Sequence, residues 1–379
     1  MRVDLPKPDP DELAHSERVA ALIRGEIEAA GGALDFSLYM ELALYAPGLG
    51  YYSAGAAKFG AAGDFITAPE FGFVFARCLA RALAPTLRET RGDILELGPG
   101  SGALAAELLA ELERLDALPA RYLLLERSAD LRERQRERIL RHCPHLRDRC
   151  AWLDAPPSAP WRGALVANEV LDALPVRRFV VRDEGLFACA VGVGEPGRFV
   201  WCEVPADVGL REAVTRFIAD DARLPRPYHS EVCTMLAPWF AEVTRNLEHG
   251  SAWFIDYGYD RADYYSAQRS SGTLRCHFRQ RAHDDPLLLP GLQDITAHVD
   301  FDALIEVGVA AGFEATALES QAQFLIRHGL DEVFADAYAA APDEAARYAL
   351  AQQVKRLTLP GQMGESFRVA RFDIERAAA

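Results

Sequence analysis

Short apolar runs and longer amphipathic stretches alternate along this chain. The runs that look like buried strands cover residues 93–97, 121–126, 150–154, 163–168 and 251–256. Helical patterns separate them, and strands that alternate with helices form a mostly parallel sheet covered on both faces. The pattern therefore predicts an α/β fold.

The segment after the first predicted strand has the spacing of an amphipathic helix. Its apolar stripe consists of Leu104, Leu108, Leu112 and Leu115. The charged residues expected off this stripe are Glu107, Glu111, Glu113 and Arg114. A helix with one apolar stripe buries that stripe, so we expect this helix to pack on the sheet.

Two further groups of strands are predicted later in the chain. Residues 179–183, 186–193 and 198–204 predict a small antiparallel meander, inserted between the fourth and fifth strands. Residues 313–319 and 367–374 predict two last strands, of which the second can pair antiparallel at the end of the sheet. The main sheet then has seven strands.

The length allows this core together with additions to it. The chain has 379 residues, half of them apolar, which is enough for a sizeable core. We expect a helical and loop region over residues 1–90 that contributes to a ligand site, and the first part of the core over 91–177. Residues 178–250 are then an insertion, and 251–379 complete the core and the far side of the site.

The composition of the chain disfavours several classes of partner and of bound group. The 56 acidic and 41 basic residues give a net charge of −15, which repels nucleic acid. Seven cysteines include no Cys-x-x-Cys pair, so neither a disulfide framework nor a bound metal is expected. No apolar run approaches the roughly 18 residues of a membrane span. The first residues lack a signal or transit pattern, which favours a cytoplasmic location.

The arginine-rich stretch of residues 126–149 has two readings. Acidic residues interleave with the arginines at helical spacing, which favours a solvated helix face with i,i+4 pairs over an RNA-binding patch. His142 and His145 lie close together there, but Pro144 ends the helix and no second ligand pair is near. A metal site is therefore disfavoured.

Gly98, Gly100 and Gly102 follow the first predicted strand, and Ala103 follows them. This spacing satisfies both the dinucleotide pattern and an alternating glycine pattern, and three such glycines can also serve helix packing without any ligand.

Two carboxylates beside these glycines separate the alternatives. Glu96 stands where it would repel a pyrophosphate but suits a ligand that carries an ammonium and a sulfonium group. Pro99 removes an amide that phosphate would need. Glu126 ends the second strand, where it can hold ribose hydroxyls. These features favour S-adenosylmethionine over NAD.

Asn168, Glu169 and Asp172 follow the fourth predicted strand, where an acceptor meets the methyl group. Methyltransferases that act on base nitrogens tend to carry Asn-Pro-Pro-aromatic there, and that run is absent. Two carboxylates three residues apart can hold a guanidinium group by charge-assisted bonds. The alternative is that Glu169 caps a following helix and Asp172 bonds backbone amides.

Several later residues are candidates for the acceptor side. Asp256 ends the fifth strand, and the segment 293–298 follows a long loop. His298 is a candidate proton acceptor, although a lone histidine is more often structural. Among the tyrosines at positions 39, 45, 51 and 52, we expect most to fill the core.

Nine ordered motifs resemble the MidA-like methyltransferases, whose mitochondrial members assist the assembly of respiratory complex I. The motifs are MELALYAPGLGYYS, GDFITAPE, ELGPGSGALAAELL, LLERSADLRERQ, ANEVLDALPV, FIDYG, SSGTLRCHF, GLQDITAHVDF and LTLPGQMGESFRV. They extend over most of the chain. The sequence departs from the family after Pro69 and Glu70, where Phe71 stands in place of the usual Ser-Gln, and this leaves the shape of that loop open.

The resemblance implies a class I, Rossmann-like methyltransferase fold with S-adenosylmethionine as the donor. It places the donor at the glycines and Glu126, and its other contacts at Thr67, Pro69, Glu70, Ser128, Asp154 and Asn168. It also implies arginine on a protein as the acceptor, for example a 49-kDa-type subunit of complex I. A donor-binding assembly factor with little turnover and a small-molecule methyltransferase stay open, as does a homodimer.

Overall fold

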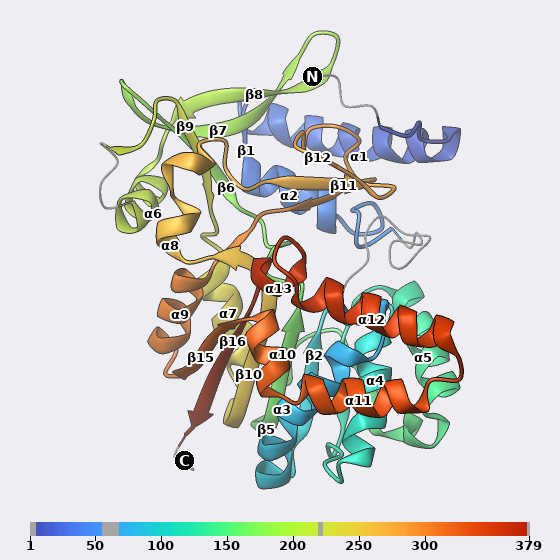
Figure 1. Ribbon diagram of the computed structural model, residues 1–379. Coiled ribbons are helices and arrows are strands. Elements are labelled where there is room, and N and C mark those ends of the chain that lie inside the picture. The colour runs from blue at the N-terminus through green and yellow to red at the C-terminus, as the bar shows by residue number, and fades with distance from the viewer. Residues whose placement is uncertain (1–4, 55–67, 219–222, 377–379) are drawn as a thin grey trace.

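The computed structural model describes residues 5–54, 68–218 and 223–376, apart from the side chain of Pro69. Figure 1 shows a twisted sheet with helices on both faces and, above it, smaller antiparallel sheets beside the N-terminal helices. Of the helices described, none is long and apolar enough to cross a membrane.

The main sheet contains every strand that the apolar runs predict. Its spatial order is β15 (Glu314–Ser320), β16 (Phe367–Glu375), β10 (Leu247–Tyr259), β5 (Trp161–Asn168), β2 (Asp93–Leu97), β3 (Tyr122–Leu125) and β4 (Cys150–Leu153). A short strand, β14 (Val299–Asp300), pairs with β10 off this path. Neighbours pair in parallel except that β16 is antiparallel to both β10 and β15. This confirms the mostly parallel α/β prediction and the antiparallel pairing of the last strand. The expected place of that strand at the end of the sheet is wrong, because β16 pairs with both β10 and β15, and β14 adds an eighth strand to the seven predicted.

Helices cover both faces of this sheet, which explains why its strands read as nearly unbroken apolar runs. One face packs against α3 (Val74–Thr90), α4 (Ala103–Arg114), α5 (Ala129–His142), α10 (Gln321–Arg327), α11 (Leu330–Ala340) and α12 (Glu344–Thr358). The other packs against α7 (Leu236–Thr244) and α9 (Phe301–Ala310). The short helix α13 (Met363–Ser366) leads into β16.

The predicted meander is present and belongs to a larger sheet. Its strands are β6 (Arg177–Arg182), β7 (Gly185–Gly194) and β8 (Arg198–Pro205), all antiparallel. Strand β9 (Tyr228–Val232) pairs with β6, and β1 (Leu34–Asp35) pairs with β7, and neither pairing was predicted. The N-terminal segment and the insertion therefore share one sheet.

The remaining elements surround that second sheet. They are α1 (Pro10–Ala29), α2 (Phe36–Tyr45), α6 (Val208–Phe217), α8 (Arg261–Tyr264) and a three-stranded sheet of β11 (Arg275–Phe278), β12 (Arg281–His283) and β13 (Asp294–Thr296). Helix α1 begins with a capping box, because Asp9 accepts from the amide of Glu12 at 2.9 Å and Glu12 accepts from the amide of Asp9 at 2.7 Å. Helix α7 packs on the main sheet although it falls within residues 178–250. The division into four segments stays a prediction.

The predicted face of α4 needs one correction. Leu104, Leu108 and Leu112 are buried as expected, but Glu111 is only 3% exposed. Its carboxylate lies 2.6 Å from Arg114 Nη2, and α3 adds Arg77 within ion-pair distance, at 3.8 Å. Because α3 packs along a second face of α4, a charged residue off the leucine stripe becomes buried with cationic partners.

The arginines of α5 form a different set of pairs from the one predicted. Arg136 pairs with Glu133 within the helix at i,i+3, whereas Arg132 and Arg138 reach Asp154 and Glu70 on other segments. The helix does end at His142, before Pro144.

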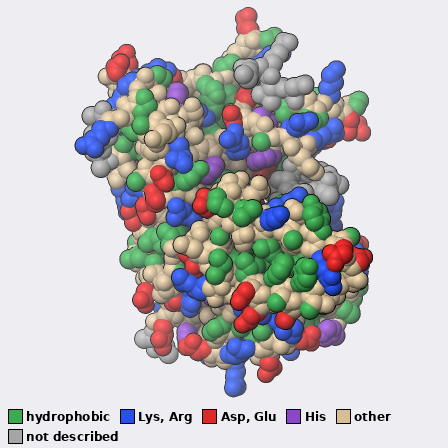
Figure 2. All heavy atoms as spheres, in the orientation of Figure 1, with side chains coloured by type: hydrophobic (Ala, Val, Ile, Leu, Met, Phe, Trp, Pro, Cys, Tyr) green, Lys and Arg blue, Asp and Glu red, His purple; other side chains and the backbone are tan. Residues whose placement is uncertain are grey.

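One group of exposed apolar side chains lies on the face that Figure 2 shows. Figure 2 shows them over α10, α11 and α12, where Ile326 is 66% and Tyr348 67% exposed. On the face that Figure 2 shows, acidic and basic side chains are interspersed around this region.

Strand β16 should be essential to the core, and Phe372→Ala tests this expectation. Phe372 is fully buried, with ring centroids 5.6 Å from Phe240 and 5.8 Å from Phe254. Its truncation leaves a cavity, so the free energy of unfolding measured in urea should fall by about 3–5 kcal/mol. The exposed Tyr348→Ala should change it by about 0.5 kcal/mol or less. Equal effects of the two substitutions would contradict this account of the core.

Candidate active site

The glycine turn after β2 has the backbone that glycine favours. Gly98, Gly100 and Gly102 have φ values of 58°, 52° and 79°. A Cβ atom at Gly98 would lie 3.1 Å from Val170 Cγ2, and one at Gly102 would lie 3.1 Å from the Cα of Gln135. Close packing thus accounts for part of the glycine requirement at two of the three positions.

Gln135 connects this turn to Glu126. Its amide donates to the carbonyl of Gly100 at 2.8 Å and to Glu126 Oε2 at 3.3 Å, while its oxygen accepts from Trp152 Nε1 at 2.8 Å. Glu126 Oε1 accepts the Ser128 amide at 2.8 Å. Burial raises the pKa of Glu126, and these donors oppose the rise. The carboxylate is thereby held beside the glycine turn.

The structure places the other predicted donor residues around the same edge of the sheet. Ser128 caps α5, and Asp154 follows β4, where Arg132 Nη2 donates to it at 2.6 Å. Glu96 is buried in β2 and accepts a hydrogen bond of 2.7 Å from Tyr122, and burial raises its pKa to about 7. Thr67 lies outside the described residues.

The segment after β5 is a turn rather than a helix. Asp256 of β10 accepts hydrogen bonds at Oδ2 from three successive amides, those of residues 170, 171 and 172, at 3.1, 2.9 and 3.2 Å. Glu169 has a φ of 54°. The alternative in which Glu169 caps a helix is therefore wrong, because a buried carboxylate from the neighbouring strand binds those amides instead.

Glu169 and Asp172 both lie in this turn, with Asp294 near them. Burial, followed by the charge of Asp172, raises the pKa of Glu169 to about 8. Burial raises the pKa of Asp172 to about 6, while hydrogen bonds from Tyr257 and from amides of residues 172 and 173 lower it. Among the described residues, the groups that shift the pKa values of Glu169 and Asp172 include no lysine or arginine.

Two of the four tyrosines adjoin these carboxylates. Tyr52 donates to Asp294 Oδ1 at 2.7 Å, and Tyr45 stacks on Tyr52 with centroids 5.5 Å apart. Tyr45 is 38% exposed, so it lies at the outer edge of the group. Tyr39 and Tyr51 fill the core, so the prediction that most of the four tyrosines do so holds for only two of them.

His298 has the contacts of a structural residue. Its Nδ1 lies 3.2 Å from the carbonyl of Thr273, and its ring stacks on Tyr259 at 5.0 Å. Burial lowers its pKa to about 4, so it is a weak base. A role as proton acceptor stays a prediction.

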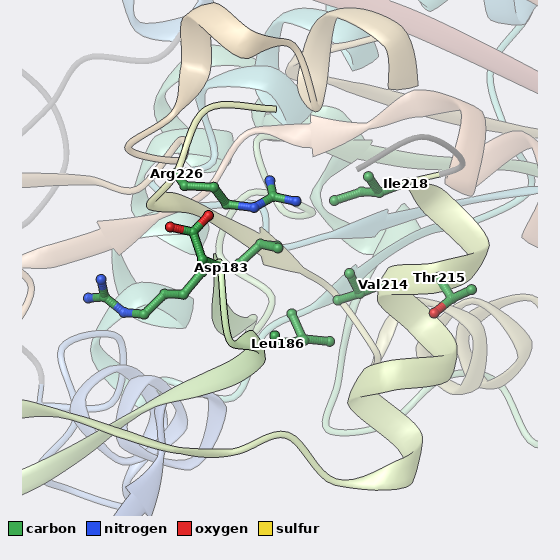
Figure 3. A pocket seen from close by; sticks show the side chains of 9 residues that line it. Asp183, Leu186, Val214, Thr215, Ile218 and Arg226 are labelled. Atoms are coloured by element: carbon green, nitrogen blue, oxygen red, sulfur yellow. The ribbon is translucent and has the colours of Figure 1, made fainter. Parts of the chain in front are cut away.

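Other candidate sites lie apart from this edge. Among the described residues, no group of three or more His, Cys, Asp or Glu side chains is arranged to hold a metal ion. A cavity of about 500 Å³ opens in the insertion, between the β6–β7 hairpin and α6. Figure 3 shows Asp183 and Leu186 from the hairpin and Val214 from α6 around it, and none of the predicted site residues lines it.

Sequence reasoning missed Gln135, and a signal for it exists. Leu131, Gln135 and Ile139 occupy one stripe of α5 and are all buried. A polar residue on an otherwise apolar stripe must find a hydrogen-bond partner inside the protein. Asp256 carries the same signal, because it interrupts the apolar strand β10.

Comparison with known proteins agrees with this geometry. Residues 78–318 match the family described as "Putative S-adenosyl-L-methionine-dependent methyltransferase". The chain belongs to this family. It is 41% identical to a protein from Burkholderia thailandensis that was solved bound to S-adenosyl-homocysteine, with a TM-score of 0.93, covering 99% of this chain and 97% of that one.

Curated relatives are more distant. The mitochondrial protein arginine methyltransferase NDUFAF7 of Danio rerio is 28% identical, covering 89% of this chain and 83% of the relative. Its human counterpart is 26% identical, covering 89% and 79%. The protein is therefore a methyltransferase whose donor is S-adenosylmethionine, and the resemblance seen in the motifs is confirmed.

The residues at the glycine turn fit this donor. Asn168 ends β5, and its Oδ1 atom is buried with no hydrogen-bond partner among the described residues. A hydroxyl or amino group of bound S-adenosylmethionine can donate a hydrogen bond to this oxygen. Glu126 would place a carboxylate where the ribose hydroxyls of the donor can bind. The bound donor supplies an electrophilic methyl carbon on a sulfonium sulfur.

Gly100→Val should impair donor binding without unfolding the protein. A β-branched residue is strained at the φ of 52° that Gly100 adopts, so the turn must shift. Strain of this kind should weaken binding of S-adenosylhomocysteine, measured by titration calorimetry, by about 10- to 100-fold. Gly312→Val is the control, because Gly312 has a φ of 87° and open space around it, outside the site. Unchanged affinity in Gly100→Val would remove the turn from the donor site.

Proposed function

We propose that this methyltransferase acts on an arginine side chain of a protein, and that Glu169 and Asp172 hold the guanidinium group. The observation that carries the proposal is the group of carboxylates at the carboxyl ends of β5 and β10. Among the described residues, no lysine or arginine is one of the groups that shift the pKa values of Glu169 and Asp172, and ligands of open α/β sheets bind at this edge.

A guanidinium group complements this arrangement in charge and shape. It presents several N–H donors in one plane, and carboxylates three residues apart can accept them from two directions. Without such a cation, the raised pKa values keep part of the group protonated, which limits the cost of burying like charges. When a guanidinium group binds beside Glu169, its positive charge lowers the pKa of Glu169 and favours the ionised carboxylate.

The same carboxylates can handle the proton of the transfer. A guanidinium nitrogen forms a bond to the methyl carbon while the carbon–sulfur bond breaks, and that electron pair stays on sulfur. The nitrogen gives up one proton. Because the pKa of free arginine exceeds about 12, the proton leaves during or after bond formation. Glu169, whose pKa burial raises to about 8, lies in position to accept it.

The relatives support the acceptor class. The mitochondrial relatives are named protein arginine methyltransferases. On the strength of the motif resemblance, we further propose a 49-kDa-type subunit of respiratory complex I as the acceptor protein.

Glu169→Gln should keep the donor bound and lose transfer. The amide keeps the shape of the side chain but loses the charge-assisted bond, which is worth about 2 kcal/mol, so transfer should fall about 30-fold or more. The assay measures tritiated-methyl transfer to the 49-kDa-type subunit of the cognate complex I, and calorimetry measures S-adenosylhomocysteine affinity.

Two controls accompany this assay. Glu184→Gln changes an exposed acid in the β6–β7 turn and should leave transfer unchanged. A version of the subunit with its candidate arginines changed to lysine should not be labelled. Full labelling of that version would exclude arginine, and full activity of Glu169→Gln would remove Glu169 from the mechanism. Tight donor binding with no transfer to any acceptor would favour an assembly factor.

Transfer should also rise with pH. Guanidinium binding needs ionised carboxylates, and burial raises the pKa of Asp172 to about 6 and that of Glu169 to about 8. At subsaturating acceptor, kcat/KM should therefore increase from about pH 6 through pH 8 and level off above about pH 9.

The same pKa shifts act on folding stability in the opposite direction. A carboxyl group whose pKa is higher in the folded state than in the unfolded state contributes to the free energy of unfolding. For Glu169 this contribution is fully present below the ordinary pKa of 4.5 and is lost as the pH rises through the folded pKa of about 8. Without acceptor, Glu169→Gln should thus gain stability relative to the wild type at pH 9, as measured by urea denaturation. A kcat/KM that falls from pH 6 to pH 8 would contradict the charged-pocket mechanism.

A further inference from the structure

A short 3-10 turn, η1 (Ala68–Phe71), lies between the donor side and the acceptor side of the site. Its Glu70 carboxylate accepts hydrogen bonds from the Ser101 hydroxyl and, at 2.9 Å, from Arg138 Nη1. Arg138 Nη1 also donates to Ser101. Ser101 stands between Gly100 and Gly102, so these three side chains fasten η1 to the glycine turn and to α5.

The other end of η1 contacts the acceptor carboxylate. The amide of Ala68 donates to Glu169 Oε1 at 3.3 Å. Ala68 is fully buried, and Glu70 follows it by only two residues. The position of the Ala68 amide therefore depends on where Glu70 is held.

Helix α12 supports η1 from a third direction. The guanidinium of Arg356 lies 4.9 Å from the ring centroid of Phe71. At Gly72, whose φ is 138°, a Cβ atom would lie 2.4 Å from Gln353 Nε2. Contacts on several sides thus define one position for the turn.

We propose that Glu70, Ser101 and Arg138 form a latch that holds η1 where the Ala68 amide can orient the Glu169 carboxylate. Glu70 and Arg138 are then positioning residues for methyl transfer, acting through Glu169. The latch couples the turn that binds the donor to the group that receives the acceptor. It rests on the proposed role of Glu169.

The groups that face Glu169 determine what loss of the latch should do. Asp172 of the same turn, Asp256 of β10 and Asp294 of β13 are acidic neighbours. The donors to Glu169 are the Ala68 amide of η1 and, at 3.3 Å, the Asn168 side chain. Burial raises the pKa of Glu169, and the Ala68 amide lowers it. Releasing the amide should move ionisation of Glu169 to higher pH.

Hydrogen exchange can test the latch without any acceptor. With S-adenosylhomocysteine bound, mass spectrometry should show exchange of the 68–73 segment accelerated about tenfold in Glu70→Gln and Arg138→Ala, because the turn opens more often. Ser101→Ala is a milder variant, which removes one hydroxyl group and should give a smaller acceleration. Glu133→Gln is the matched control on α5, since it breaks the Arg136–Glu133 ion pair of 3.4 Å and should change nothing in this segment.

The pH dependence of transfer then tests the coupling to Glu169. In Glu70→Gln the rising limb of kcat/KM should move to higher pH by about half a unit or more, and Glu70→Asp should restore it partly. If the Glu70–Arg138 ion pair had only a structural role, its loss would lower the free energy of unfolding and leave the rising limb of kcat/KM at the same pH. Unchanged exchange in Glu70→Gln and Arg138→Ala, or accelerated exchange with an unmoved limb, would overturn the proposal. Full activity of Glu169→Gln would instead overturn the role of Glu169, and this outcome is distinct from both.

Discussion

The turn that follows β5 depends on one carboxylate, whose hydrogen bonds all come from backbone amides in the part of the chain that the structure describes. Asp256 is fully buried in β10 and accepts three successive amides from the turn after β5. Those amides would be satisfied by a helix N-cap in another sequence, and here the neighbouring strand supplies the acceptor. The bonds let Glu169 keep a positive φ that non-glycine residues rarely adopt, at the cost of some backbone strain. Asp256 therefore holds the backbone of the turn from which the Glu169 side chain extends.

This constraint places several acids in one buried region, which opposes folding. Burial and the charges of Asp172 and Glu169 raise the pKa of Asp256 well above its ordinary value. Packing in the core offsets this cost, for example the contacts among the rings of Phe240, Phe254 and Phe372. Local conflict of this kind is common where a site must bind a charged group.

Much of the fold could be predicted because the strands of the main sheet are buried on both faces and read as continuous apolar runs. The positions of the three glycines and of Glu126 were predictable as well, because the glycines follow β2 and Glu126 follows β3, both of which were predicted as parallel strands. The pairing of β1 with β7 could not be predicted, because two residues carry too little pattern to indicate a partner so far along the chain. To predict the burial of Glu111, one must know that α3 packs beside it. To predict the turn at Glu169, one must know that Asp256 binds its amides. In each case the deciding group came from another element of the chain.

The place of β16 has a consequence for synthesis of the protein. It is the last strand described, yet it lies between β10 and β15, and β15 has β16 as its neighbour in the main sheet. A nascent chain that already contains the glycine turn, the turn after β5 and strand β15 still lacks β16, which joins β15 to β10. Apolar surfaces of β10 and β15 then stay exposed to other chains or to chaperones until β16 leaves the ribosome. Emergence of β16, rather than synthesis of the site residues, should therefore set the moment at which the main sheet can be completed.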